Sequence, residues 1–465
     1  MIENDAFKLL LINLFHLNPD DIANILCTTF NKMMVLLVTL TDKHQACPYC
    51  GFTAPKIKEY VTKEITHSAL TTQKCIIKYR ARRYKCSCCG KTYYEFNPFV
   101  FKSQKISILT VHNILKDLKD FNETFTSVAR RYHVSPTSVS TIFDNHVDIG
   151  RNPLPEIINF DEVYAFKSEK SKYVCVILDF KKQIPVDVLP NRKKEYLLNY
   201  FQKIPLEERK KVKYACSDMY EVYRDVVHKV FPESKHLLDY FHLSQDFHKK
   251  MNQVRIDVMK GYKDNKASDE YYLLKKFNWL LFKNPEDEDK YGRLFDVERE
   301  RKYNSHFKSY MNYYDLRKKI LEINNDLTIC YSLKLELVDF YSKSTIDNAK
   351  VNLENLIRSC IDTNIDEMIA FSNNLINWKQ EIINSFTIVG TEYKVEADKG
   401  QVVVCNKKVN NAIIENRNKI IKCIKNNANG YTNWSRFRNR VMYVLDPNAT
   451  FSLEPREKQS WMHKT

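Results

Sequence analysis

Two Cys-x-x-Cys pairs constrain the fold of this chain more than any other feature of its sequence. The pairs are Cys47/Cys50 and Cys86/Cys89, and a glycine directly follows the second cysteine of each. Glycine lets the backbone turn back so that amide groups point at the thiolate sulfurs. Four thiolates in a tetrahedral array suit Zn²⁺, so the spacing predicts a structural zinc site in a small β unit. The alternative is a reduced, metal-free thiol cluster, and Cys88 is expected to be a spare thiol in either case.

Composition and charge bound the remaining interpretation. A chain of 465 residues, 44% of them hydrophobic, is long enough for roughly two to four folded units. The formal net charge of +16 favours a polyanionic partner such as nucleic acid, although an AT-rich genome would also inflate the lysine count. The longest apolar run, Met33 to Leu40, is far shorter than the ~20 residues that span a bilayer. With its odd number of 13 cysteines, the chain is expected to be a reduced, cytoplasmic protein.

Cationic side chains gather in a predicted strand that leads into the second cysteine pair. The stretch from Lys74 to Cys86 alternates basic and apolar residues with the period of a strand pair. A zinc unit would hold this strand against DNA phosphates, and the side chains that we expect to make those contacts include Arg80, Arg82 and Arg83.

A helix-turn-helix is predicted next, with helical spacing over residues 106–118, 124–133 and 136–146. Ser135 is placed as an N-cap and Pro136 as the first helical residue, so the last helix begins directly after the turn. A generic helical hairpin also matches such a short pattern, but the basic zinc unit before it favours DNA contact. The residues expected to face DNA here are Arg130, Arg131, Thr137 and Ser138.

An α/β unit with a large helical insertion is predicted for the rest of the chain. Strand patterns occupy residues 158–166, 171–180, 184–190, 214–218 and 236–243, with helical segments at 193–204 and 219–231. Helical patterns then continue to about 385, before a strand hairpin at 387–408 and a basic helix at about 411–426. The expected units are an N-terminal segment with a short helix at Asn18 and a strand from Met33 to Thr41 (1–45), a zinc-binding domain (46–100), a helix-turn-helix domain (101–150), the first part of a catalytic core (151–243), a mainly helical insertion (244–408), the C-terminal helix and basic segment of the core (409–446) and a tail (447–465).

Acidic residues at strand ends are the candidate catalytic groups. Asp161 lies in an apolar strand pattern, where an unpaired charge is costly unless the strand opens onto a metal or a cleft. Asp218 follows a second strand and precedes a helix, the position where ligands of open α/β sheets gather. Asp179 and Asp239 also lie at or near strand ends, so position alone does not choose among these four carboxylates.

Several motifs resemble those of the insertion-sequence L-three (ISL-three) transposase family, from Cys47 to about Leu445. They are CPYCG and RRYKCSCCG in the zinc unit, INFDEV at Asp161, YACSDMYEVYRDVVHKVFP at Asp218, LLDYFHL at Asp239 and His242, and ENRNKIIKCIKNNANGYTNWSRFRNRV from Glu415. The resemblance implies a zinc unit, a helix-turn-helix and an RNase H-like mixed-sheet core whose catalytic residues are Asp161, Asp218 and Glu415. Two departures surround Glu415: Asn410-Asn411-Ala412 replaces the usual Ser-Asn-Gly, and Asn416 replaces a glycine.

The activity that this resemblance implies is metal-dependent cleavage and transfer of DNA strands at the terminal inverted repeats of an insertion sequence. Three acids would hold two Mg²⁺ (or Mn²⁺) ions, as phosphodiester transfer requires. The partners would be double-stranded repeat and target DNA in a bacterial nucleoid, and joining two ends predicts at least a homodimer. A basic run beside the site is expected to grip phosphates, with Lys419, Lys422, Lys425, Arg436 and Arg440 among its members. His242 is expected to have a structural role. The alternatives are a DNA-binding regulator that has lost catalysis and another RNase H-like nuclease.

Overall fold

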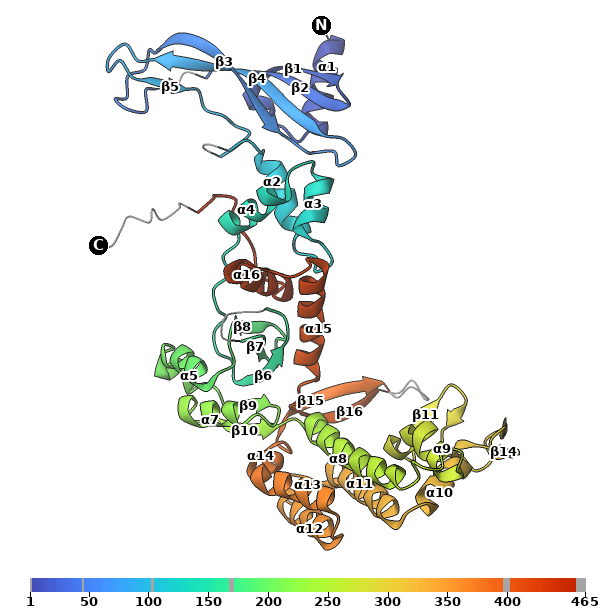
Figure 1. Cartoon of the computed structure of the whole chain (residues 1–465). Coiled ribbons are helices and arrows are strands. Elements are labelled where there is room, and N and C mark those ends of the chain that lie inside the picture. Colours follow the sequence, from blue (N-terminus) through green and yellow to red (C-terminus); the bar gives the residue numbers. More distant parts are fainter. Residues whose placement is uncertain (1, 44–45, 102–103, 167–170, 396–401, 457–465) are drawn as a thin grey trace.

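The computed structural model describes residues 2–43, 46–101, 104–166, 171–395 and 402–456. The molecule is elongated, with an N-terminal sheet at one end and a block of helices at the other (Figure 1). Three short helices and a second sheet lie between them, and α15 runs along the flank of that second sheet. Among the helices of the described ranges, none is long and apolar enough to cross a membrane.

The N-terminal sheet combines strands from both sides of residue 45. β1 (Ile22–Phe30), β2 (Met33–Leu40), β4 (Cys75–Lys85) and β3 (Lys56–Thr66) lie in that order, and β5 (Thr92–Tyr94) also pairs with β4. The alternating basic stretch forms a strand, as predicted, and this strand, β4, is antiparallel to β3 and parallel to β2. The boundary expected between residues 45 and 46 therefore falls inside one sheet.

The first twenty residues differ from the sequence prediction. The helix expected at Asn18 is a single 3₁₀ turn (Pro19–Asp21), and β1 begins directly after it. An α-helix that the sequence reading missed, α1 (Ile2–Leu14), precedes this turn and packs Leu11 and Ile12 against the core of the sheet. Its opposite face carries leucines as well, which obscures the periodicity by which an amphipathic helix is recognised.

Three helices follow close to their predicted positions: α2 (Ile108–Asp117), α3 (Phe125–Arg131) and α4 (Pro136–His146). The prediction for the start of α4 is confirmed, because the Ser135 hydroxyl accepts a hydrogen bond from the Ser138 N–H and Pro136 is the first helical residue. Ala129, Val139 and Ile142 contribute to the small core that these helices share.

The central sheet has five strands in the order β10-β9-β6-β7-β8. They are β6 (Ile157–Val163), β7 (Val174–Asp179), β8 (Pro185–Leu189), β9 (Tyr214–Ser217) and β10 (Lys235–Leu238). β6, β7 and β8 are antiparallel neighbours, whereas β9 and β10 run parallel to β6. The predicted mixed α/β unit is therefore present, with its middle strand carrying Asp161.

Helices cover both faces of this sheet. Because strand side chains alternate between faces, Ile158 and Phe160 of β6 pack on one side with α5 (Lys194–Gln202) and α7 (Glu221–Val230). The short α6 (Leu206–Arg209) follows α5 in the chain. Val163 packs on the opposite side with α15 (Ala412–Asn427) and α16 (Trp434–Leu445). Asp161 has the same parity as Val163 and so belongs to the face that α15 covers.

The strand expected over residues 236–243 is wrong in its second half. β10 ends at Leu238, Asp239 is the N-cap, and the long helix α8 (Tyr240–Lys260) begins at once. Leu243, Phe247 and Met251 recur every four residues and are all buried, a helical period that outweighs the local strand pattern.

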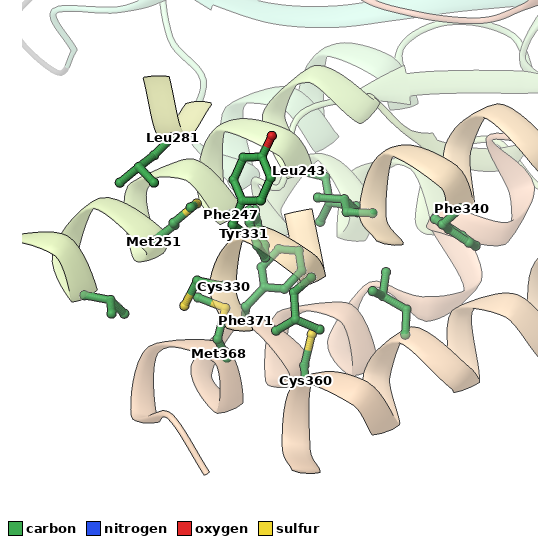
Figure 2. Packing of buried hydrophobic residues seen from close by; sticks show 14 of the residues in the cluster. Leu243, Phe247, Met251, Leu281, Cys330, Tyr331, Phe340, Cys360, Met368 and Phe371 are labelled. Atoms are coloured by element: carbon green, nitrogen blue, oxygen red, sulfur yellow. The ribbon is translucent and has the colours of Figure 1, made fainter. Parts of the chain in front are cut away.

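The predicted helical insertion forms a core of its own, shown in Figure 2. Phe247 of α8, Cys330 of α11 and Phe371 of α13 meet at its centre. Its further helices are α9 (Asp269–Lys276), η2 (Asn278–Phe282), α10 (Tyr313–Glu322), α11 (Asn325–Lys343), α12 (Ala349–Asp362), α13 (Asp366–Asn377) and α14 (Lys379–Asn384). Two small hairpins that were not predicted, β11 (Glu288–Asp289) with β12 (Gly292–Arg293) and β13 (Lys302–Asn304) with β14 (Ser309–Met311), interrupt the helices. The predicted later hairpin is confirmed as β15 (Ile388–Val395) and β16 (Val402–Lys408).

Substitution of Phe371 tests the core of the insertion. Phe371 is fully buried, with its ring edge-to-face against Phe247 at a centroid distance of 5.0 Å. We expect Phe371→Ala to lower the free energy of unfolding of this region by about 3–5 kcal/mol, because it deletes apolar contacts and leaves a cavity. Urea denaturation followed by tryptophan fluorescence measures the change. Ile376 on the same helix is 51% exposed, so Ile376→Ala is the matched control and should change stability by less than ~0.5 kcal/mol.

Candidate functional site

Asp161 projects from β6 into the contact between the central sheet and α15. Its carboxyl group is buried and accepts two hydrogen bonds of 2.7 Å, from the Glu162 N–H to Oδ1 and from the Asn418 side-chain amide to Oδ2. Glu162, the next residue, forms an ion pair with Arg192. Each Asp161 oxygen is thus held in place by one amide donor, and the arginine neutralises Glu162.

The parallel strands bring two more acids to the same edge of the sheet. Asp218 directly follows β9 and Asp239 directly follows β10, and the last residues of these two strands, Ser217 and Leu238, pair with each other. β9 also pairs with β6, with Asn159 opposite Cys216, so Asp161 and Asp218 both lie two residues beyond a paired position. Register alone therefore gathers these carboxylates.

Glu415 and His242 join Asp239 from two different helices, in a group of potential ligands that, among the described residues, does not include Asp161 or Asp218. Glu415 lies in the first turn of α15 and His242 in the first turn of α8. One ligand atom each from Asp239, His242 and Glu415 lies within 4.8 Å of the other two. His242 was predicted to have a structural role, and Asp239 was one of four strand-end acids among which position did not choose. The structure places both residues beside Glu415.

Asp179, the fourth strand-end acid, has a different environment. It ends β7, and its Oδ1 accepts hydrogen bonds from the backbone N–H groups of Lys181 and Lys182 at 2.9 and 3.0 Å. These bonds cap the turn between β7 and β8. The structure thus distinguishes a turn-capping acid from the three acids that follow or lie on parallel strands.

The unusual turn before Glu415 is held firmly. Asn411 is fully buried, and its backbone N–H donates to Asp239 Oδ1 at 3.2 Å. The Asn159 amide group donates to the Asn410 carbonyl oxygen at 2.8 Å and to Asn411 Oδ1 at 2.7 Å. The sequence departure at residues 410–412 therefore leaves α15 docked on β6, with Glu415 on the site side.

Burial sets the electrostatics of the three aspartates. It raises the pKa of Asp161 to about 7; the nearby Asp218 charge adds to the rise, and the Glu162 N–H and His242 oppose it. Burial also raises the pKa of Asp218, helped by Glu162, and that of Asp239, helped by Glu415. Asp218 Oδ1 and Asp239 Oδ2 are buried atoms with no hydrogen-bond partner within the described part of the chain. Such a set of oxygen donors suits a hard divalent cation such as Mg²⁺ or Mn²⁺.

The four predicted zinc ligands do converge at the edge of the N-terminal sheet. The Sγ atoms of Cys47 and Cys89 are 3.7 Å apart, and those of Cys50 and Cys86 are 3.5 Å apart. Tetrahedral Zn²⁺ with Zn–S bonds of about 2.3 Å requires sulfur separations close to these values. Gly51 and Gly90 have φ values of 74° and 71°, as the tight turns after each pair require.

The second cysteine pair also has the expected amide contact. The Cys89 N–H points at Cys86 Sγ at 3.5 Å, and this contact is the largest of those that lower the Cys86 pKa to about 7. A thiolate favoured in this way is the form that binds metal. Cys88 is exposed and lies outside the four-sulfur set, as predicted.

The arginines expected on the basic strand differ in their environments. Arg80 is exposed and lies over the Tyr60 ring. Arg82 instead pairs with the buried Glu95, and Arg83 pairs with Glu59, both at 2.7 Å. Arg82 therefore ties β4 to the segment after β5, and Arg80 is the freest of the three to meet a ligand.

The residues of α3 and α4 that were predicted to contact DNA also differ, since some are exposed and others pair within the protein. Arg130 and Thr137 are exposed and Ser138 is half-buried beside its capping contact, whereas Arg131 forms ion pairs with Asp117 and Glu123. Arg130 also lines a cavity of about 390 Å³ between α3 and the turn that joins α15 to α16.

Two of the C-terminal residues that were predicted to contact DNA phosphates instead contact other parts of the protein. Arg436 holds Asp144 of α4 through its guanidinium group at 2.6 Å, and Arg440 is buried, donating to two backbone carbonyl oxygens in the loop between α2 and α3. Lys419 and Lys422 are exposed on α15, and Lys425 lies over the Tyr164 ring. Arg436 and Arg440 thus fasten α16 to the three-helix unit.

Loss of zinc provides a test of the cysteine cluster. We expect the full-length protein, washed with a weak chelator such as citrate, to retain about one zinc ion per chain, because four thiolates close the site. Elemental analysis should find this zinc lost in Cys50→Ser, with a lower melting temperature. Cys88→Ser is the matched control and should keep its zinc. Equal zinc contents in the two variants would contradict the assignment.

The raised pKa of Asp161 predicts a pH-dependent stability. In the folded chain Asp161 keeps its proton up to about pH 7, whereas an unfolded aspartate loses it at about pH 3.9. Between these values the folded state binds more protons, so the contribution of Asp161 to stability falls as pH rises, by up to about 4 kcal/mol in total. In buffer free of divalent cations, Asp161→Asn should therefore gain stability over the wild type between pH 5 and pH 8, measured as melting temperature. A pH-independent difference would contradict the burial of a protonated Asp161.

Similarity to known proteins covers most of the chain. Residues 158–397, just over half of the sequence, match the model of a transposase family, ISL3; the match includes Asp161, Asp218, Asp239 and His242 and ends before Glu415. The chain is also 19% identical, over 412 residues, to the transposase for insertion sequence element IS1001 of Bordetella parapertussis, an alignment that covers 88% of this chain and 91% of that relative. The prediction drawn from the sequence motifs is thus confirmed: the chain belongs to the ISL3 family of transposases.

Proposed function

We propose that this transposase binds the terminal inverted repeats of its insertion sequence and catalyses metal-dependent cleavage and transfer of DNA strands. Asp161, Asp218 and Glu415 are the proposed metal-binding carboxylates. The observation that carries the proposal is that Asp161 and Asp218 lie close enough for their charges to interact at one edge of the central sheet, where Glu415 of α15 has a ligand atom within 4.8 Å of those of Asp239 and His242. The order β8-β7-β6-β9-β10, with β6 to β8 antiparallel and the rest parallel, supports an RNase H-like core.

The protein residues organise this site for cations. Asn418 and the Glu162 N–H fix the Asp161 carboxyl group, and each of its oxygens keeps a lone pair for a metal ion. Asp218 offers a buried oxygen with no partner in the described ranges. Two divalent ions, when bound, supply charge stabilisation for the attacking and leaving oxygens of an in-line displacement. Fixing the ligands beforehand reduces the reorganisation that the reaction would otherwise need.

DNA binding is proposed for exposed polar and cationic residues on α15, on the three-helix unit and on the N-terminal sheet. Lys419 and Lys422 lie on the helix that carries Glu415, and Arg130 and Thr137 lie on the three-helix unit that Arg436 and Arg440 fasten to the core. We interpret α3 and α4 as a helix-turn-helix that positions the repeat, with Arg80 adding a phosphate contact from the zinc-bearing sheet. Joining two ends requires at least a dimer on DNA.

A catalytically inactive regulator is the second candidate, since zinc unit and helices alone would bind DNA. The buried acids disfavour it: a protein without catalysis gains nothing from three aspartates whose pKa values burial raises. A junction-type nuclease would keep the acids, but has no evident need of a separate zinc unit and helix-turn-helix.

Cleavage of DNA carrying the element's terminal repeats tests the proposal. With Mg²⁺, the wild-type protein should nick at the repeat ends, and Asp218→Ala should lower the rate by roughly 10³-fold, because a metal ligand contributes several kcal/mol to transition-state stabilisation. Both proteins should shift the repeat DNA equally in a gel-retardation assay. Asp225→Asn is the control, since Asp225 lies on the adjacent helix α7 and pairs with Lys194 at the surface.

Two results would reject parts of this proposal. Unchanged Mg²⁺-dependent cleavage by Asp218→Ala would show that the three-carboxylate assignment is wrong. Binding of the repeats without any cleavage by the wild type would favour the regulator.

A further inference from the structure

Asp239 and His242 form, with Glu415, a second group of potential metal ligands whose arrangement follows from local sequence. Asp239 is the N-cap of α8 and His242 lies three residues later, so both side chains fall on the same side of the first helical turn. Glu415 reaches the same point from α15, and the three ligand atoms lie within 4.8 Å of one another.

Two buried polar atoms of this group lack a hydrogen-bond partner among the residues that the structure describes. The Asp239 side chain is 3% exposed; its Oδ1 accepts the Asn411 N–H, but its Oδ2 has no hydrogen-bond partner in the described ranges. His242 Nε2 is likewise buried and unpartnered there, 3.8 Å from that oxygen. A buried carboxylate oxygen and a buried ring nitrogen without partners are costly unless something binds both.

Direct pairing between His242 and Asp239 does not meet this need. Their separation of 3.8 Å exceeds the length of a hydrogen bond, and an attraction between charges would also require a protonated imidazole. A cation among the Asp239, His242 and Glu415 atoms would satisfy the orphaned oxygen and nitrogen together. The second acidic residue, Glu415, provides further negative charge for it.

The chemistry of the donors indicates which cation. Mg²⁺ binds oxygen ligands almost exclusively, whereas imidazole nitrogen is a ligand for transition metals. A nitrogen donor therefore shifts selectivity from Mg²⁺ towards first-row divalent metals, of which Mn²⁺ also accepts carboxylate oxygens readily.

We infer that Asp239 and His242 bind a divalent cation together with Glu415, and that this mixed oxygen and nitrogen site prefers Mn²⁺ to Mg²⁺. The inference rests on the proposed function only in placing this cation at the catalytic edge of the sheet. It adds two ligands to the three carboxylates of that proposal and makes one of the metal positions selective.

Electron paramagnetic resonance of Mn²⁺ bound to the full-length protein, without DNA, tests the inference directly. Electron spin echo modulation should detect nitrogen from a bound imidazole in the wild type, and this signal should be lost in His242→Gln. His248→Gln is the control, because His248 lies on the same helix but contacts Phe247 and Phe282 instead. It should retain the nitrogen signal.

Affinities give a second measurement. Titration should show that His242→Gln and Asp239→Asn each weaken Mn²⁺ binding by at least about 10-fold. Loss of a residue that only orients a metal ligand already lowers metal affinity by about this factor, and loss of a ligand should cost no less. Mg²⁺ competition should reveal tighter binding of Mn²⁺ by the wild type, and His242→Gln should narrow that difference.

Specific outcomes would overturn the inference. A wild-type protein that binds Mn²⁺ without a nitrogen signal would exclude His242 as a ligand, whether or not the variants fold. An unchanged Mn²⁺ affinity in a folded Asp239→Asn variant would exclude Asp239. Since no DNA is present, failure of repeat cleavage would reject the proposed function and leave this result standing, whereas intact cleavage without the nitrogen signal would reject only the mixed-ligand site.

Discussion

The contact between α15 and β6 positions the whole candidate site. Ile414 and Ile421 of α15 are fully buried against the sheet, and burial of each such side chain contributes roughly 1.5–3 kcal/mol. These apolar contacts hold the helix on the sheet but do not fix its position along the strand. The hydrogen bonds from Asn159 to Asn411 and from Asn418 to Asp161 do so, one on each side of Glu415 along the helix. A shift of α15 by one turn would break both.

The hydrogen-bond and ion-pair partners of the buried acids leave Asp161 able to bind a metal ion. An arginine beside Asp161 would neutralise it and occupy both oxygens. Instead, the nearby Arg192 forms an ion pair with Glu162, and Asp161 accepts hydrogen bonds from two amide groups. Amides orient the carboxyl group without supplying a countercharge, so no positive side chain competes with a cation at Asp161. The raised pKa values of Asp161 and Asp218 are the electrostatic consequence.

Periodicity in the sequence predicted much of the fold, and it failed where long-range contacts decide. Four of the five strands of the central sheet, the three helices after the cysteine-rich sheet and the 387–408 hairpin follow local patterns and were placed within a few residues. Asp239 shows the limit: the strand pattern around it continues to Leu243, but burial of Phe247 and Met251 against the insertion starts a helix at Tyr240. The role of His242 depended on that helix, because only a helical turn brings it to the same side as Asp239.

Motif resemblance predicted Asp161, Asp218 and Glu415 together as site residues, which periodicity did not do. It gave no account of the arginines. Arg440 falls in the register of the family motif and reads as one more cation in a basic run, yet it is buried and bonded to carbonyl oxygens of the loop between α2 and α3. Whether an arginine faces solvent or its own protein depends on acids and carbonyl groups hundreds of residues away, such as Asp144 for Arg436. A single sequence does not show these pairings.

The two ends of the helical insertion meet at the candidate site. The chain leaves the central sheet at Asp239, forms the separate core of Figure 2, and returns at Asn411, whose N–H donates to Asp239 Oδ1. This hydrogen bond thus joins the residues at which the chain leaves the central sheet and returns to it, next to Glu415. The insertion adds length without separating Glu415 from the aspartates, because its two ends are fixed to each other. A change in how the insertion packs would therefore be felt first at Asp239 and the start of α15, where the proposed metal ligands of both ends meet.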